Sequence, residues 1–372
     1  MSGNDTTEIV EQSTFTAVIL PTFYLLLSIY VIIVNLIELV IITRIKTSSS
    51  TIFIASLAMT DLTMGIFAIL PSSVSFLLKF DKFFLGAILC DISGVISNTS
   101  LFASLLSVVC ITLNRYIALA VPLHYNKIST NQTGYTVTGL IWFISLLRSL
   151  VPYFKLERYQ YAISIGMCSY GTNIFQENEI YYYPLIQVIP YSICFVFLIF
   201  CPLHMTALLS KRQRQSTTMR SSLRKSEDNS GAKGAFSRLQ SGSLKKNGSR
   251  AKGKAKQNER EATTTTLLVV LGFVVCYSVN YYFICYYFGY LVLGYWPFEM
   301  GRAWDVLETL WMMGMNLNSI FNPIIYLFRN TAFKTELLKM KQSVLRFCKC
   351  AEDTGVHTVI KGTSSGSTSY KS

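Results

Sequence analysis

Charged residues are scarce in this chain of 372 residues. Asp, Glu, Lys and Arg make up 14% of it and hydrophobic residues 51%, whereas a soluble domain carries roughly 25% charged residues. So few charges in so long a chain exclude a protein whose whole surface faces water. The composition therefore indicates an integral membrane protein.

Histidines are few and internal repeats are absent. These two features argue against an enzyme and against a transporter or channel. The three histidines, His124, His204 and His357, are expected in a loop, at a helix end and in the tail. Because they share no site, we do not expect an enzyme. No inverted repeat of the kind found in transporters is present, and Asp61 is the only acid deep in the second to seventh expected helices. A transporter or channel is therefore the weaker interpretation.

Basic residues are missing from the start of the chain, since no Lys or Arg precedes Arg44. A cleavable signal peptide begins with a basic stretch, so we expect none and expect the first helix to act as its own anchor. The triplet Asn4-Asp5-Thr6 predicts a glycan on Asn4 if this end lies outside the cell.

Seven apolar runs are each close to the roughly 20 residues that one helix needs to cross a bilayer. They are Phe15–Ile42, Ile52–Leu78, Phe84–Leu113, Tyr135–Tyr153, Ile180–Leu209, Thr263–Leu293 and Val306–Phe328. A buried helix of a soluble protein can mimic one such run but not seven. The sequence predicts an all-α membrane protein built as a seven-transmembrane helix bundle.

The distribution of basic residues predicts the orientation of this bundle. An extracellular N-terminus places 27 of the 33 Lys and Arg residues in the cytoplasm and five outside. Short cytoplasmic loops are enriched in Lys and Arg, so this orientation is the expected one. The tail 1–17 is then extracellular and the tail 346–372 is cytoplasmic.

One cytoplasmic loop, residues 211–260, holds 15 Lys or Arg residues against three acids. It is also rich in Ser and Gly, so it buries too little apolar surface to order itself, and we expect it to be disordered. A nucleic-acid partner is not expected, because the loop connects two membrane spans. Anionic lipid of the inner leaflet is the expected contact.

Most of the nine cysteines fall inside expected helices, where a thiol packs as a small hydrophobic group. Cys90, near the outer end of the third helix, and Cys168, in the following outer loop, both face the oxidising side, where a disulfide is allowed. Cys348 and Cys350 follow a short amphipathic stretch after the seventh run. Palmitoylation of these two would anchor a short eighth helix to the inner leaflet.

Polar residues inside a membrane are costly and need an explanation. Asp61 is a lone acid in the second helix, and other helices offer Ser104, Asn318 and Asn322 at a comparable depth. A carboxylate among oxygen ligands suits a sodium ion or a cluster of waters, and plain hydrogen bonding between helices is the alternative. No other cofactor is expected.

Several motifs occur in a fixed order along the expected helices. They are Asn35, the run Leu57–Leu62, Asn114-Arg115-Tyr116, Trp142, Pro152, Pro190, Asn322-Pro323-Ile324-Ile325-Tyr326, Phe328-Arg329 and Phe333. With these motifs, the chain resembles the rhodopsin-like (class A) G-protein-coupled receptors over roughly residues 18–345. Within that family it resembles the amine-receptor branch most, without that branch's aspartate in the third helix.

The resemblance implies a plasma-membrane receptor that binds an extracellular small molecule or peptide and activates a heterotrimeric G protein. Arrestin and membrane lipid would be further partners. A polytopic transporter or a receptor-like protein that does not signal is the alternative.

The resemblance also implies an activation switch at the inner face. Arg115 would be held by Glu259 at rest and released on activation, which makes the pair a two-state element that an agonist biases. Pro323 would kink the seventh helix and let Tyr326 and Asn322 rearrange.

The chain departs from the family pattern at four positions that bear on activation. Asn114 replaces the acid before the arginine, Tyr277 replaces the tryptophan of the sixth helix, Val279 replaces the proline after it, and Leu198 replaces a tyrosine of the fifth helix. These changes predict raised basal activity or altered coupling, and they leave the fold intact.

The expected ligand pocket is aromatic, polar and uncharged. Ser97 stands where amine receptors have their aspartate, and Asn316 stands where opsins have a lysine. A few hydrogen bonds in such a pocket suit a small molecule or peptide, although core packing explains the aromatics equally well. The expected ligand-binding residues are Ser97, Asn98, Tyr182, Tyr183, Tyr277, Asn280, Tyr281, Met312 and Asn316.

Overall fold

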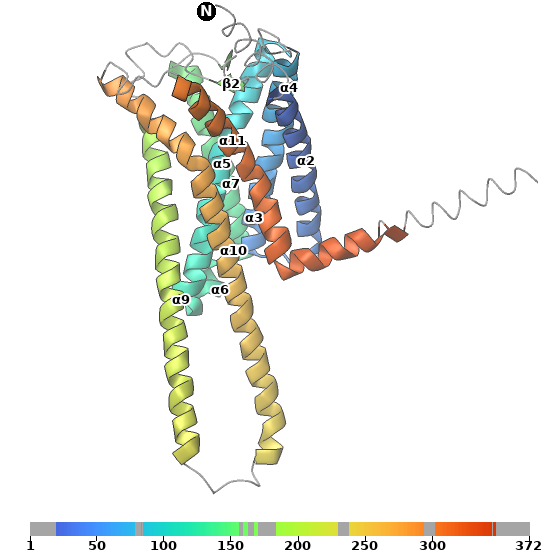
Figure 1. Ribbon diagram of the computed structural model, residues 1–372, viewed down its shortest axis with the longest axis vertical. Helices are drawn as coiled ribbons and strands as arrows, with labels where there is room; N and C mark the ends of the chain where they lie inside the picture. Colours follow the sequence, from blue (N-terminus) through green and yellow to red (C-terminus); the bar gives the residue numbers. More distant parts are fainter. Residues whose placement is uncertain are drawn as a thin grey trace, which may run out of the picture.

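A computed structural model describes residues 20–78, 83, 85–155, 159–162, 167–169, 184–229, 238–293, 302–343 and 345–346. Within these residues the chain forms an elongated bundle of helices (Figure 1). The helices in chain order are α2 (Leu20–Arg44), α3 (Ser49–Met64), η2 (Gly65–Ile69), α4 (Leu70–Leu77), α5 (Ala87–Ala120), α6 (Pro122–Ile128), α7 (Asn131–Lys155), η3 (Pro184–Val188), α9 (Ile189–Asn229), α10 (Arg238–Leu293) and α11 (Arg302–Arg329).

These segments make the seven membrane helices that the apolar runs predict. The second consists of α3, η2 and α4 in succession, and the fifth consists of η3 and α9. Among the described residues, six helices are long and apolar enough to cross a membrane, and α11 is the seventh. The expected all-α bundle is confirmed.

Local sequence explains where two of the helices begin. The Ser48 side chain accepts a hydrogen bond from the Thr51 N–H while the Thr51 hydroxyl accepts one from the Ser48 N–H, so a capping box starts α3. Gly86 precedes α5 with a φ of 87°, a conformation that glycine adopts without a steric penalty.

The α10 and α11 helices approach closely at Gly314, where a Cβ would lie 2.6 Å from the Cys276 carbonyl oxygen. Any side chain at this position would push the two helices apart.

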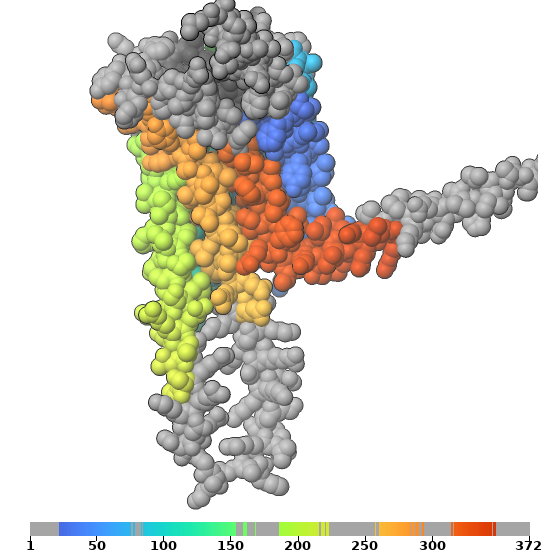
Figure 2. Space-filling model, viewed as in Figure 1, coloured from blue at the N-terminus to red at the C-terminus, as the bar shows by residue number. Residues whose placement is uncertain are grey.

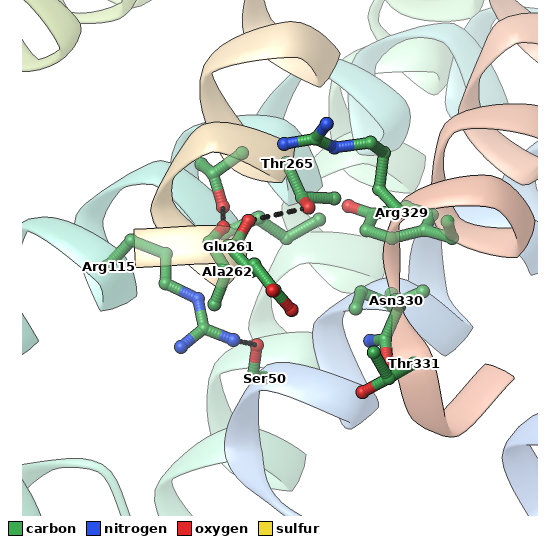
Figure 3. Close-up of a pocket in the computed structure, with 12 residues that line it drawn as sticks. Ser50, Arg115, Glu261, Ala262, Thr265, Arg329, Asn330 and Thr331 are labelled. Atoms are coloured by element: carbon green, nitrogen blue, oxygen red, sulfur yellow. Dashed lines mark hydrogen bonds between the residues drawn. The ribbon is translucent and has the colours of Figure 1, made fainter. Parts of the chain in front are cut away.

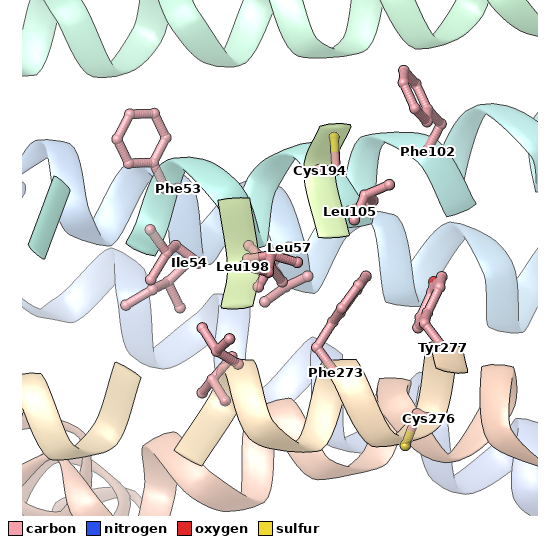
Figure 4. Close-up of a cluster of buried hydrophobic side chains, with 14 of the residues drawn as sticks. Phe53, Ile54, Leu57, Phe102, Leu105, Cys194, Leu198, Phe273, Cys276 and Tyr277 are labelled. Carbon is pink, nitrogen blue, oxygen red and sulfur yellow. The ribbon is translucent and has the colours of Figure 1, made fainter. Parts of the chain in front are cut away.

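The hydrophobic core lies between α3, α5, α9 and α10. Phe273 and Tyr277 project from α10 toward Leu105 of α5 (Figure 4), and their rings stack with centroids 4.0 Å apart. Leu198 of α9 is 1% exposed in the same cluster. The leucine at this position thus serves as core packing.

A disulfide joins Cys90 of α5 to Cys168, with the two Cα atoms 5.5 Å apart, so the expected bridge is confirmed. Cys168 lies in the strand β2 (Met167–Ser169), which pairs antiparallel with β1 (Gln160–Ala162). Phe83 and Tyr161 pack against the bridge, and burial raises the pKa of the Tyr161 phenol. The bridge fixes the outer hairpin to the end of the third membrane helix.

The expected disorder of the loop 211–260 is wrong for most of its length. The α9 helix continues to Asn229 and α10 starts at Arg238, so both extend beyond the rest of the bundle (Figure 1). The unfavourable step in helix formation is nucleation, and here each extension continues an existing helix. Lys, Arg and Gln, which are common in the loop, are also good helix formers. Residues 230–237 lie outside the described part.

A short helix over 331–343 follows α11 and projects sideways from the bundle (Figures 1 and 2). Asn330 caps it by accepting the Ala332 N–H at 3.0 Å. Phe333 is fully buried, whereas Leu338 is 52% exposed. The expected amphipathic eighth helix is confirmed, and Cys348 and Cys350 lie outside the described residues.

We expect Cys90→Ser and Cys168→Ser to reduce surface expression to the same degree, and the double variant to lose no more than either single one. The reason is that both changes break one bond and leave the same hairpin free. Flow cytometry of the epitope-tagged protein measures the effect, and Cys110→Ser is the matched control. Additive losses would contradict a shared structural role.

Candidate functional site

Asp61 connects three helices in the interior of the bundle. Its carboxylate accepts hydrogen bonds from Ser319 Oγ at 2.8 Å and from Asn322 Nδ2 at 3.1 Å, both in α11. Asn35 of α2 donates through Nδ2 to the Ser319 carbonyl at 3.1 Å. Asp61 is 2% exposed, and polar groups buried in a bilayer must find their partners within the protein. The network therefore holds α2, α3 and α11 together.

Ser104 and Asn318 add polar atoms that have no hydrogen-bond partner within the described structure. The Ser104 Oγ and both amide atoms of Asn318 are buried in this way. Buried polar atoms are normally satisfied by protein or water, so this donor set fits a water or a small cation. Of the four expected site residues, Asp61 and Asn322 bond directly, while Ser104 and Asn318 do not bond to Asp61.

Glu38 is a second buried acid, 1% exposed, for which the sequence offered no role. It lies one turn from Asn35 along α2, and its Oε1 has no partner among the described residues. Glu38 therefore lies on the inner side of the network around Asp61, and no hydrogen bond joins it to Asp61 among the described residues.

Arg115 lies at the inner end of α5 and donates from Nη2 to Ser50 Oγ of α3 at 2.9 Å. The side chain of its expected partner, Glu259, lies outside the described residues, so the Arg115–Glu259 pair stays a prediction. The described contact shows a neutral restraint on the arginine instead. A single hydrogen bond to a charged group contributes about 1.5–3 kcal/mol.

Asn114 forms a further set of neutral contacts beside Arg115. Its Oδ1 accepts hydrogen bonds from Ser129 Oγ at 2.7 Å and Ser49 Oγ at 3.3 Å. Its Nδ2 donates to Tyr125 Oη at 3.4 Å. The amide that replaces the family's acid thus connects α5 to α3 and α6.

These contacts border a cavity of about 160 Å³ at the inner face (Figure 3). Its walls come from α3, α5, α10 and α11 and the turn after α11. The lining residues are Ser50, Ile54, Ile111, Arg115, Glu261, Ala262, Thr265, Thr266, Tyr326, Arg329, Asn330 and Thr331. Both arginines and Glu261 are available at this surface, so the cavity has the charged groups that a cytoplasmic partner can recognise.

Tyr326 is a buried residue that lines this cavity. It is 3% exposed, and its hydroxyl has no partner among the described residues. Its ring lies 6.0 Å from that of Phe333 in the helix 331–343. The α11 helix contains Pro323 within its length. Three of the expected switch residues, Arg115, Tyr326 and Pro323, therefore lie along one side of the inner bundle.

In the outer half, the expected pocket residues divide into two groups. Tyr281 shares a hydrogen bond of 2.7 Å with Ser192, and Tyr277 stacks on Phe273. Ser97 and Asn98 donate to the Gly94 carbonyl at 3.0 and 3.2 Å. Asn280 and Asn316 are 7% and 3% exposed. The second group, Tyr182, Tyr183 and the Met312 side chain, lies outside the described residues.

Comparison with known proteins identifies the family. Residues 29–326 match the family described as "7 transmembrane receptor (rhodopsin family)". The chain belongs to this family. Its members are receptors, in agreement with the expectation that the chain is not an enzyme.

Individual relatives of this receptor are distant. Proteinase-activated receptor 3 of Homo sapiens is 26% identical over 195 residues, which are 51% of each chain. Galanin receptor type 2 of Rattus norvegicus is 24% identical over 94% of this chain and 83% of its own. Melatonin receptor type 1A of Mus musculus is 26% identical over 45% and 46%. The receptor spans about half the length of the first relatives it matches, and these relatives do not single out the amine branch.

Sequence reasoning missed the serines at the inner end of the receptor. The run Thr47-Ser48-Ser49-Ser50-Thr51 signals a helix start, and Ser48 has that role. Its neighbours Ser49 and Ser50 instead contact Asn114 and Arg115. Nothing in the linear sequence pairs them with residues 65 positions away.

We expect Asp61→Asn to abolish any sodium dependence of ligand affinity and to weaken signalling while surface expression is kept. The amide retains a hydrogen-bond acceptor for α11 but removes the negative charge that a cation needs. Ligand competition in sodium and in choline chloride measures the effect. Asp91→Asn, a change in α5 away from the network, is the control. Equal sodium sensitivity in wild type and Asp61→Asn would contradict a cation site.

We expect Ser50→Ala to raise ligand-independent signalling about tenfold or more, because it removes the described hydrogen bond to the charged Arg115. Basal second-messenger output, normalised to surface expression, is the measurement. Thr43→Ala, a change at an exposed residue of α2 whose hydroxyl bonds within its own helix, is the control. Basal output that does not rise in Ser50→Ala would show that this contact does not restrain the resting state.

Proposed function

We propose that this chain is a G-protein-coupled receptor that binds an extracellular small molecule or peptide and activates a heterotrimeric G protein. The inner cavity supports the proposal most directly, because it combines Arg115, Arg329 and Glu261 with Tyr326 at the base of the seventh helix. A cytoplasmic protein that inserted there would contact four membrane helices at once. Its binding would depend on their relative positions.

The hydrophobic core provides a route from the outer pocket to this cavity. Phe273 and Tyr277 of α10 pack in the core that also contains Tyr326 of α11. Tyr326 in turn lines the cavity together with Arg115. A ligand that favoured one arrangement of α10 would thereby change the population of the cavity that a G protein binds. A few kcal/mol of differential binding is sufficient for such a shift.

The remaining partners and the location follow from the same proposal. The receptor would lie in the plasma membrane with its N-terminus outside, and Asn4 would carry a glycan. Arrestin would compete for the inner cavity. The basic helical extensions of α9 and α10 would contact anionic lipid, and palmitoyl groups on Cys348 and Cys350 would hold the helix 331–343 at the inner leaflet. Asp61, Ser104, Asn318 and Asn322 would hold sodium or water.

We expect Glu259→Ala to raise ligand-independent G-protein activation and Asn114→Asp to lower it. The first change removes the predicted acid partner of Arg115, and the second adds a charge beside it while keeping the Oδ1 acceptor for Ser129. A loss of about 1.4 kcal/mol multiplies the active-to-inactive ratio about tenfold. Basal nucleotide exchange on co-expressed G proteins is the measurement.

Arg115→Ala tests the proposed function itself, with Arg44→Ala, an exposed basic residue at the inner end of α2, as the control. Loss of G-protein activation in Arg115→Ala alone is the expected result. Unchanged basal activation in Glu259→Ala together with this loss would contradict the Arg115–Glu259 pair but support the proposed function. If none of the variants changes activation of any G protein, the proposed coupling is wrong.

A further inference from the structure

Arg148 of α7 is a cation within a membrane helix that neither the network nor the inner cavity uses. It lies seven residues before Lys155, at the outer end of α7, which corresponds to about 10 Å along the axis. It is half-buried. A charge at such a depth is costly unless it is paired, and it marks a functional position by default.

In the described part of the chain, the contacts of this guanidinium are all with neutral groups. Nε donates to the Ile186 carbonyl in η3 at 2.9 Å, and Nη2 donates to Gln187 Oε1. The Cζ atom lies 4.5 Å from the centroid of the Phe102 ring and 5.5 Å from that of Tyr191. Aromatic faces attract a cation but do not neutralise it. Among the described residues, no acidic side chain forms an ion pair with Arg148.

The neighbouring helices explain why the counter-ion is missing. The α7 helix contains no acid, and the acids of α9, Glu227 and Asp228, stand at its far inner end. The one acid of α5 is Asp91, eleven residues or about 16 Å along the helix from Phe102. None of these reaches Arg148, so within the described residues the guanidinium has no balancing negative charge.

Arg148 is also placed where a ligand can reach it from the membrane. The α5 helix packs against both α7 and α9, whereas α7 and α9 touch little, and Arg148 bridges the seam between them. Large exposed apolar side chains stand close in sequence to Arg148 on α7 and to Tyr191 on α9. Ile144 is 49% exposed on α7, and Ile189 and Ile193 are 47% and 65% exposed on α9.

From this geometry we propose that Arg148 binds the carboxylate head of an amphipathic ligand whose acyl chain lies along the seam between α7 and α9. The guanidinium supplies a fork of N–H donors that matches a carboxylate, and the apolar side chains match the chain. A free fatty acid fits better than a phospholipid of the bilayer, because Arg148 lies about 10 Å inward of the end of α7. That depth is below the level of the lipid headgroups.

Such a ligand would also contact the proposed signalling route. Tyr191 is 3% exposed and lies beside Arg148 on one side, and its hydroxyl interacts with Asn280 of α10. Its ring packs against Phe102 with centroids 5.8 Å apart. Neutralising Arg148 would therefore act on α10 through Tyr191. This part of the inference rests on the proposed receptor function, and the binding part does not.

Oleate binding to the purified full-length receptor tests the site, with methyl oleate and oleyl alcohol as uncharged probes of the same length. The receptor is held in nanodiscs of neutral phosphatidylcholine, and both the dissociation constant and the thermal midpoint are measured. We expect oleate to raise the midpoint and the uncharged probes to have little effect. Arg148→Gln should weaken oleate binding at least about tenfold, the loss expected for a charge-assisted pair.

Further variants separate binding from folding. Arg148→Lys keeps the charge and should bind oleate with an intermediate affinity, and Tyr191→Phe should keep oleate binding while weakening its effect on signalling. Arg44→Gln removes an exposed positive charge elsewhere and should bind like wild type. If Arg148→Gln fails to fold, Arg148→Lys and the uncharged probes still decide the question.

Three results would overturn the inference. They are equal stabilisation by methyl oleate and oleate, unchanged oleate affinity in a folded Arg148→Gln, and full competition by phosphatidylglycerol placed in the nanodisc. The first two would show that Arg148 has only a structural role, and the third would show that bilayer lipid is the occupant. Because the assay contains no G protein, any of these leaves the proposed function standing. Oleate binding without G-protein activation by any variant would instead contradict the proposed function and support the site.

Discussion

The hydrogen bonds that Asp61 accepts from Ser319 and Asn322 set the relative positions of the second and seventh membrane helices, and Asn35 adds the first. Inside the bundle bulk water cannot replace these partners, so the carboxylate holds the helices in one register. That register places Tyr326 against Phe333 and at the wall of the inner cavity. The inner face of the receptor thus depends on a contact made deep in the bundle.

At the inner face, hydrogen bonds from neutral groups stand where ion pairs would restrain the resting state more strongly. Ser50 holds Arg115, and Asn114 bonds to Ser49 and Ser129. A neutral hydrogen bond contributes about 0.5–1.5 kcal/mol and one to a charged group about 1.5–3 kcal/mol. Contacts of this size stabilise the resting state only modestly. They suit an element with two populated arrangements.

The outer half of the receptor combines a packed aromatic core with one unbalanced charge. Phe273, Tyr277 and Leu198 are buried together, so the residues that depart from the family pattern form part of a close-packed core. Arg148 is the exception, since its contacts are carbonyl, amide and ring groups. An unpaired cation among neutral partners is the feature of this half that points to a ligand of opposite charge.

The sequence alone determined the seven helices, the amphipathic eighth helix and the Cys90–Cys168 bridge. Apolar length, local periodicity and the family's motif order can all be read from the order of residues along the chain. Only the tertiary structure decided that Ser50 contacts Arg115, that Glu38 is buried near Asp61, and that no acid of the described residues reaches Arg148. It also showed α9 and α10 continuing through much of the loop expected to be disordered, where helix growth from an existing end outweighs poor burial. Each of these depends on which side chains meet across helices, and residues far apart in a chain carry no local signal of that meeting.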